Sequence, residues 1–299
     1  MFPLIMVPLD GSPFADRAVD PGAALAAHHQ ARLLLVAVHE RLAGTEAADR
    51  EDREALAAHL LHHADAAASR WHVRTDTRVV DVNGDVADTL SAFADQEGVG
   101  LVVMTTHGRG AAGRAWFGSV ADRFIRSTAK PVLLLRHEMA DGRTSFRRIL
   151  VPLDGSAAGE LAIDDALAMD HSESEIIVLR VVVPVIAYST MPAGGVVLAG
   201  GVLEDQRADA ERYARGVAAR IEARGHRAHA MVVVDTSAAA AILDAEEDRK
   251  PDLIVMSGTI RGGVDRLLLG SVMDKVVRHA QVPVLMRRTP GPGKDAAGR

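Results

Sequence analysis

A stretch of sequence that occurs twice places the strongest constraint on the fold of this 299-residue chain. Val7-Pro8-Leu9-Asp10-Gly11-Ser12 returns as Val151-Pro152-Leu153-Asp154-Gly155-Ser156. Further along, the segments Gly118-Ser119-Val120 and Pro131-Val132-Leu133 return as Gly270-Ser271-Val272 and Pro283-Val284-Leu285. Repetition at such a long period indicates two similar domains of ordinary size in tandem. The second copy is longer, and its extra residues are predicted between Pro184 and Val202.

Polar and glycine-containing stretches mark the borders of the two copies. We predict a first domain over residues 1–138, a linker over residues 139–146 and a second domain over residues 147–288. Residues 289–299 are rich in proline and glycine, so we predict a disordered tail there.

Each copy alternates short apolar runs with helical segments, a pattern typical of parallel βαβ units. In the first copy the predicted strands are 4–9, 32–39, 73–82, 100–105 and 131–136. The helices between them are predicted at 13–30, 46–70, 85–96 and 119–127. In the second copy the predicted strands are 148–153, 175–183, 228–235, 252–257 and 283–287. The predicted fold class is therefore α/β, with two tandem, doubly wound, Rossmann-like parallel sheets. A doubly wound sheet of five strands usually reverses its strand order once, and we take the order to be 3-2-1-4-5.

The strand order also predicts where a ligand binds. Open parallel sheets bind ligands where the strand order reverses, outside the carboxyl ends of the strands. In this order the reversal lies between the first and fourth strands, and the repeated motifs follow those two strands. A helix that starts at Gly118-Ser119 offers free N–H groups and a partial positive charge, which suits phosphate. Alternatively, Ser119 only caps its helix, and Asp10 only forms a turn with Gly11 instead of contacting a ligand or metal.

Two common nucleotide-binding motifs fit the sequence poorly. Gly108-x-Gly110-x-x-Gly113 has the dinucleotide-binding spelling, but it follows the fourth strand instead of the first and does not recur in the second copy. After Gly113 the lysine and the hydroxyl residue of a P-loop are missing, so efficient phosphoryl transfer is not expected.

Composition excludes several other functions. A net charge of −6 argues against a nucleic-acid partner, and the absence of cysteine excludes disulfides, thiolate metal sites and cysteine nucleophiles. His59, His62 and His63 have helical spacing, and we interpret them as a half-buried or solvated helix face, with no metal site predicted. Because no uncharged apolar run could span a bilayer and the first residues lack signal-peptide features, we expect no membrane partner and a cytoplasmic location.

The sequence resembles the universal stress protein family. The resemblance rests on Val-Pro-Leu-Asp-Gly-Ser at the end of the first strand, Val103-Met104-Thr105-Thr106-His107-Gly108 at the end of the fourth, a nine-residue spacer to Gly118-Ser119, and Pro-Val-Leu in the last strand. It covers essentially the whole chain twice, as in tandem members of the family. The ATP-binding members carry Gly-x2-Gly-x9-Gly-Ser/Thr, and here Thr105 replaces the first glycine.

The resemblance implies ATP as the ligand, with or without Mg²⁺ or Mn²⁺. In domain 1 the implied ATP-binding residues are Asp10, Ala37, Thr105, Gly108, Gly118, Ser119 and Val120. In domain 2 the implied counterparts are Asp154, Val181, Ser257, Ile260, Gly270, Ser271 and Val272. Ile260 stands where glycine belongs, and a β-branched side chain resists positive φ and crowds a ligand. We therefore predict weaker ATP binding, or a rearranged loop, in domain 2.

The family resemblance also implies how the domains pair and act. The two domains are expected to be related by a pseudo-twofold axis, with the apolar last strands 132–135 and 284–286 adjacent. The implied function is a nucleotide-responsive regulator of a stress or growth-arrest response, without catalytic residues, whose state a protein partner reads. A slow ATPase or nucleotidyl-transfer enzyme of the same fold, and a nucleotide-free dimerising scaffold, remain the alternatives. The sequence leaves open whether two chains pair as a homodimer.

Overall fold

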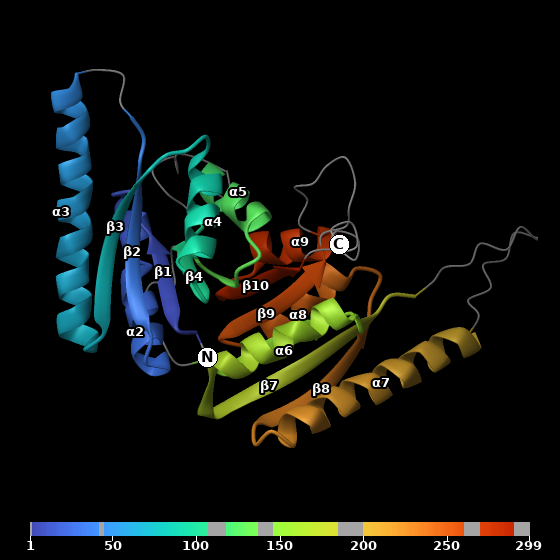
Figure 1. Ribbon diagram of the computed structural model, residues 1–299. Helices are drawn as coiled ribbons and strands as arrows, with labels where there is room; N and C mark the ends of the chain where they lie inside the picture. Colours follow the sequence, from blue (N-terminus) through green and yellow to red (C-terminus); the bar gives the residue numbers. More distant parts are fainter. Residues whose placement is uncertain are drawn as a thin grey trace, which may run out of the picture.

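The computed structural model describes residues 2–41, 45–106, 118–136, 146–184, 200–259 and 270–289, with the backbone alone at residues 170–173, 200 and 201. These residues form one ten-stranded sheet with helices on both faces (Figure 1). The strand order is β3-β2-β1-β4-β5-β10-β9-β6-β7-β8. Counted from its outer edge, each half has the order 3-2-1-4-5, as predicted.

The described part of domain 1 contains the first five strands and five helices. The strands are β1 (Leu4–Pro8), β2 (Arg32–His39), β3 (Arg74–Asp81), β4 (Leu101–Thr105) and β5 (Val132–Leu135). The helices are α1 (Pro13–Asp16), α2 (Val19–His29), α3 (Glu46–Trp71), α4 (Val86–Gln96) and α5 (Ser119–Ser127). The single helix predicted over 13–30 is thus wrong. Pro21 has no N–H to donate to Arg17, and the chain forms a tighter turn there, in which Ala18 N donates to Ala15 O at 3.0 Å.

Domain 2 repeats this arrangement. Its strands are β6 (Phe146–Leu153), β7 (Asp170–Val182), β8 (Arg227–Val234), β9 (Leu253–Thr259) and β10 (Val284–Thr289). Its helices are α6 (Ala157–Met169), α7 (Gly200–Glu222), α8 (Ala238–Arg249) and α9 (Ser271–His279). Phe146 and Thr289 belong to strands, which corrects their assignment to the linker and the tail. The rest of the predicted linker and tail, and most of the predicted insertion, lie outside the described residues.

The apolar side chains form two cores, one on each face of the sheet. One core packs β-strand residues against α2, α3, α6 and α7, and it includes Leu60, Ala64 and Val217. The other packs the opposite strand face against α4, α5, α8 and α9, and it includes Phe124 and Ile242. Figure 1 shows α3 and α7 at the two outer ends of the molecule. In the part of the chain that the structure describes, no helix is both long and apolar enough to cross a membrane.

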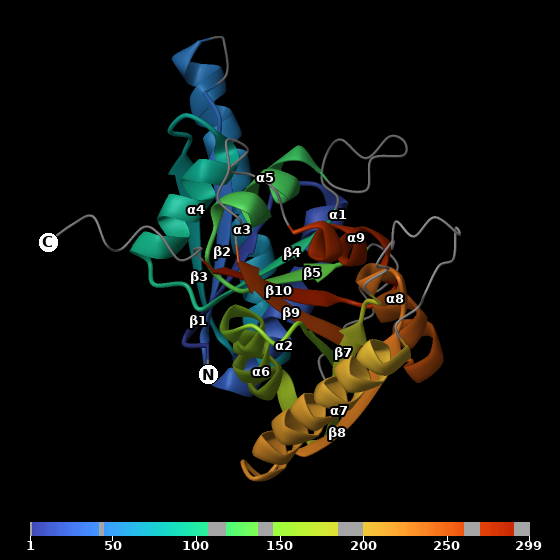
Figure 2. The same cartoon turned by 90° about the vertical axis from the view of Figure 1, so that its right-hand side faces the viewer.

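The two domains join through their last strands. β5 and β10 pair antiparallel, with Leu133 opposite Leu285 (Figure 2). Beside this junction, two ion pairs cross between α5 and α9 in reciprocal fashion. They are Arg126–Asp274 at 3.3 Å and Arg278–Asp122 at 3.5 Å. Asp274 is the repeat of Asp122, and Arg278 is the repeat of Arg126. The arginine of each domain therefore pairs with the aspartate of the other, as a twofold axis requires. The predicted pseudo-twofold pairing through strands 132–135 and 284–286 is confirmed.

The junction makes the stability dependent on pH. Hydrogen bonds from Arg278 hold the pKa of Asp274 below its usual 3.8. A lowered pKa stabilises the fold above the ordinary value, and this contribution is lost as the pH falls through the folded-state value. Because the Asp274 side chain is 29% exposed, we expect Asp274→Asn to cost only about 1 kcal/mol at pH 7. Urea denaturation at pH 7 and pH 3 checks this. The difference from the wild type should shrink at pH 3, and an equal difference at both values would contradict it.

Candidate functional site

The point where the strand order reverses lies between β1 and β4 in domain 1. Ile5 is in parallel register with Leu101, and the chain leaves β1 and β4 toward opposite faces of the sheet. Domain 2 has the same arrangement, with Ile149 of β6 opposite Leu253 of β9. Asp10 and Asp154 follow β1 and β6, and Thr105 and Ser257 lie at or near the ends of β4 and β9. The predicted carboxylate and hydroxyl of each domain therefore lie at the carboxyl ends of two adjacent strands.

A tight turn fixes Asp10 at the end of β1. Gly11 has a φ of 74°, a conformation that favours glycine, and Asp10 Oδ1 accepts a hydrogen bond from Ser12 N at 2.9 Å. Ser12 is buried and caps α1, its Oγ accepting from Ala15 N at 3.2 Å. Asp10 thus has a defined orientation, and its side chain is half-buried.

The start of α5 lies beside the end of β4. Gly118 N donates to Thr106 O at 2.9 Å, so the connection over residues 107–117 leaves and returns at one point. Gly118 is the N-cap of α5, and no side chain of the described residues accepts from its first-turn amides. By contrast, Thr45, Asp85 and Ser237 cap α3, α4 and α8 with their side chains. The first turn of α5 therefore keeps amide donors available, and Ser119 and Val120 are exposed there.

The start of α9 repeats this feature in domain 2. Gly270 is its N-cap, again without a side-chain cap among the described residues, and Ser271 is exposed. The Ser257 hydroxyl oxygen is buried and has no hydrogen-bond partner within the described ranges. Buried polar atoms are normally satisfied, so a hydroxyl in this position indicates a place for a polar ligand atom. Gly108 and Ile260, which were predicted to line the two sites, lie outside the described residues.

The strand register corrects one predicted correspondence between the domains. Pro8 is opposite Val36, so Ala37 lies beside Leu9 at the end of β1. In domain 2, Leu153 is opposite Arg180, which makes Arg180 the counterpart of Ala37. The predicted counterpart, Val181, is one residue further along and points to the other face of the sheet.

Arg180 gives domain 2 a positive charge at the position that Ala37 occupies in domain 1. Its Nη1 donates to Leu153 O at 3.2 Å, directly before Asp154. Sequence reasoning missed this residue, although a single arginine in the apolar run of β7 was a usable signal. Asp154 itself is exposed, and its Oδ1 accepts from Ser156 N at 2.9 Å and from Ser156 Oγ at 2.6 Å. The two sites therefore share a framework but differ in charge and in available space.

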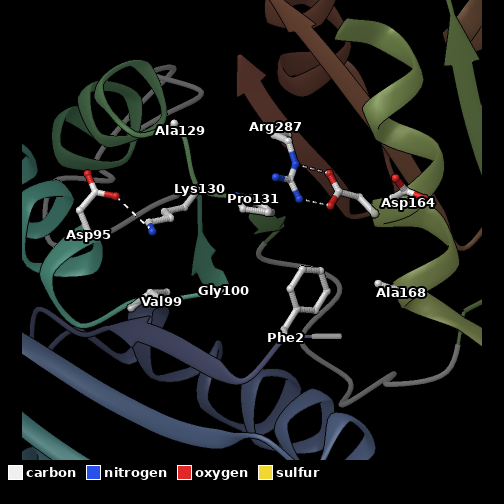
Figure 3. Close-up of a pocket in the computed structure, with 11 residues that line it drawn as sticks. Phe2, Asp95, Val99, Gly100, Ala129, Lys130, Pro131, Asp164, Ala168 and Arg287 are labelled. Atoms are coloured by element: carbon white, nitrogen blue, oxygen red, sulfur yellow. Dashed lines mark hydrogen bonds and ion pairs between the residues drawn. The ribbon is translucent and has the colours of Figure 1, made fainter. Parts of the chain in front are cut away.

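A cleft of about 460 Å³ between the domains lies elsewhere (Figure 3). Phe2, Gly100 and Pro131 line it, and each lies one or two residues before a strand, so the cleft is at the amino ends of the strands. Its cationic side chains already have partners: Lys130 pairs with Asp95 at 3.2 Å, and Arg287 pairs with a carboxylate of α6. The cleft therefore does not coincide with the point where the strand order reverses.

Comparisons with known proteins agree with this architecture. The sequence model of the universal stress protein family matches residues 1–136 and 145–288. A universal stress protein of Methanocaldococcus jannaschii is 28% identical over 158 residues, which cover 52% of this chain and 91% of that protein. A universal stress protein of Mycobacterium bovis is 28% identical over 215 residues, which cover 70% of this chain and 64% of that protein. The match thus spans just under two thirds of the mycobacterial relative.

Two solved structures share the fold over nearly the whole chain. A universal stress protein from Archaeoglobus fulgidus DSM 4304 has a TM-score of 0.71 at 19% identity and covers 95% of this chain and 98% of its own. A functionally unknown protein from Pseudomonas aeruginosa PAO1 has a TM-score of 0.60 at 16% identity and covers 96% of this chain and 92% of its own.

Proposed function

The chain belongs to the universal stress protein family, and we propose that it is a regulatory protein that binds ATP, with or without Mg²⁺ or Mn²⁺. The observation that carries this proposal is the start of α5, which has no side-chain cap among the described residues and is held beside the end of β4 by the bond from Gly118 N to Thr106 O. Backbone amides at a helix start, next to a point where the strand order reverses, are suited to phosphate. Asp10 is then the acceptor for ribose or adenine.

The energetics require contacts beyond the phosphates. Micromolar affinity corresponds to about −8 kcal/mol, whereas the charge at a helix start contributes about 0.3–2 kcal/mol. Adenine burial and backbone hydrogen bonds at the ends of β1 and β2 must therefore supply most of the affinity. Ala37 supports this role through its backbone, which lies beside Leu9 at the end of β1.

Domain 2 is the weaker ATP site in this proposal. Ile260 replaces the glycine of the phosphate loop, and Arg180 takes the place of Ala37. A long side chain reduces the room for adenine at the end of β7, while its charge attracts phosphate. Unequal sites would let the protein respond to ATP over two concentration ranges, with a protein partner reading the state.

Isothermal titration of the full chain with ATP tests the proposal. Asp10→Asn keeps the shape of the side chain and an acceptor for Ser12 N but removes the charge. We expect the affinity of the tighter site to fall about tenfold, because hydrogen bonds to charged groups contribute about 1.5–3 kcal/mol. Asp95→Asn is the matched control, because it removes the same charge from the cleft at the amino ends of the strands. It should bind ATP like the wild type.

The alternatives predict other results. A wild-type chain that binds no ATP would favour the nucleotide-free scaffold, and an unchanged affinity in Asp10→Asn would contradict the assigned site. Turnover of ATP with Mg²⁺ or Mn²⁺ at about 1 s⁻¹ or faster would favour an enzyme instead, since that is the low end for ordinary enzymes.

A further inference from the structure

Three side chains from two helices of domain 1 meet on the face of the sheet that α2 and α3 cover. Asp16 is the last residue of α1, and His59 and His63 lie one turn apart on α3. His59 Nε2 is 2.8 Å and His63 Nε2 is 3.4 Å from the same oxygen of Asp16, Oδ1. All three potential ligand atoms lie within 4.8 Å of one another, and no other such group of three is found among the described residues.

We propose that Asp16, His59 and His63 form a binding site for a divalent transition-metal ion of the Zn²⁺ type, with water completing the coordination. Ligands at about 2.0–2.2 Å from a tetrahedral ion lie about 3.4 Å from one another. The distance from His63 Nε2 to Asp16 Oδ1 already matches this value. The distance from His59 Nε2 to the same oxygen has to increase by about half an ångström. Two histidines at positions i and i+4 of a helix are a common arrangement for binding such an ion.

The surroundings favour this class of ion. Imidazole nitrogen suits Zn²⁺, Cu²⁺ and Ni²⁺, whereas Mg²⁺ prefers oxygen ligands, so this site differs from any Mg²⁺ that accompanies ATP. The three side chains are 21–28% exposed, which leaves an entry path and room for water.

Domain 2 provides an internal comparison at the same place. Glu160 of α6 is the counterpart of Asp16, and it faces α7 in the way that Asp16 faces α3. The Glu160 carboxylate accepts from Tyr213 Oη at 2.8 Å and from Arg220 Nη2 at 2.7 Å. Burial and the Glu160 carboxylate raise the pKa of Tyr213, so the phenol keeps its proton at neutral pH.

The difference between the domains lies in the groups that face the carboxylate. Arg70 and Arg224 pair equivalently with Asp20 and Asp164, which aligns α3 with α7. In that alignment Tyr213 stands for His59 and Val217 for His63. A phenol, a guanidinium and an isopropyl group bind no metal ion at neutral pH, whereas two imidazoles do. The carboxylate is therefore satisfied within domain 2, while domain 1 has three metal ligands at the same position.

Titration of the full, metal-free chain with Zn²⁺ tests the site. We expect one tight site per chain, with the affinity at least about a hundredfold weaker in His59→Gln and His63→Gln, since the loss of supporting groups alone costs about 10–100-fold. His62→Gln is the matched control, because His62 is exposed on the same helix and lies outside the group. It should bind Zn²⁺ like the wild type.

A measurement on the unaltered chain covers the case in which a variant does not fold. In NMR spectra of the histidine rings, Zn²⁺ should shift the signals of His59 and His63 at one equivalent. It should shift those of His62 much less, since that ring only contacts the ring of His63. Equal shifts over many of the 13 histidines would overturn the proposal, because they indicate unspecific binding. Unchanged affinity in both folded glutamine variants would also overturn it.

Discussion

Replacing Asp165 with alanine is expected to lower the free energy of unfolding by about 3 kcal/mol. Asp165 of α6 is 2% exposed and binds Arg287 of β10 with both carboxylate oxygens, one of them at 2.7 Å from Nε. Figure 3 shows Arg287 reaching toward α6. Removing one partner of a buried pair leaves the other charge without compensation. Because Arg287 remains 31% exposed, the expected cost is at the lower end of the range for such pairs.

Two controls separate this effect from ordinary surface charge loss. Asp164→Ala removes the neighbouring carboxylate, which is 67% exposed and pairs with exposed Arg224, and should cost less than about 1 kcal/mol. The double variant Asp165→Leu with Arg287→Leu replaces the pair with apolar groups and should lie close to the wild type. Domain 1 supports this expectation, since Pro21 and Leu135 occupy the equivalent positions. Urea denaturation followed by circular dichroism measures all three variants. A cost below 1 kcal/mol for Asp165→Ala would contradict the prediction.

The framework of the fold could be predicted because it depends on local patterns that occur twice. Short apolar runs alternate with helical segments in both copies, so the strands followed from this pattern, and their order followed from the doubly wound fold class. The family resemblance implied the pairing that joins β5 to β10, and the apolar segments 132–135 and 284–286 agreed with it, because an apolar edge strand needs a partner. The end of β4 and the start of α5 could be located because the Gly-Ser-Val segment occurs in both copies.

Residues that depend on register or on distant contacts could not be predicted. β1 and β6 share identical residues, but β2 and β7 share no motif, and the pairing of β6 with β7 contains an irregularity between Phe146 and Arg148. The predicted alignment of β7 with β2 was therefore off by one residue, and Val181 was assigned the position that Arg180 occupies. The spacing of His59 and His63 was visible, but Asp16 lies 43 residues before His59 and comes close to it only through the packing of α1 and α3. The interpretation of these histidines as a half-buried or solvated helix face was made without knowing that Asp16 lies beside them.

The start of α5 allows a sharper test of the proposed ATP site, because proline can replace Ser119. Gly118 has φ −65° and ψ 144°, an extended conformation that a following proline requires. Ser119 is the first residue of the helix, where proline fits well, so Ser119→Pro should leave the fold and its melting temperature essentially unchanged. It removes one backbone N–H and one hydroxyl. We expect ATP affinity to fall about tenfold to a hundredfold, since each charge-assisted hydrogen bond contributes about 1.5–3 kcal/mol.

Ser119→Ala separates the amide from the hydroxyl, because it removes only the hydroxyl. Isothermal titration should therefore rank ATP affinity as wild type, then Ser119→Ala, then Ser119→Pro. The same exchange in domain 2, Ser271→Pro, should affect only the weaker site, since Gly270 precedes it with a comparable φ of −51° and ψ of 143°. If Ser119→Pro binds ATP as tightly as Ser119→Ala, the amide at the start of α5 does not contact phosphate. The triphosphate would then have to bind elsewhere along the sheet edge, and the role assigned to the repeated Gly-Ser motif would reduce to starting a helix.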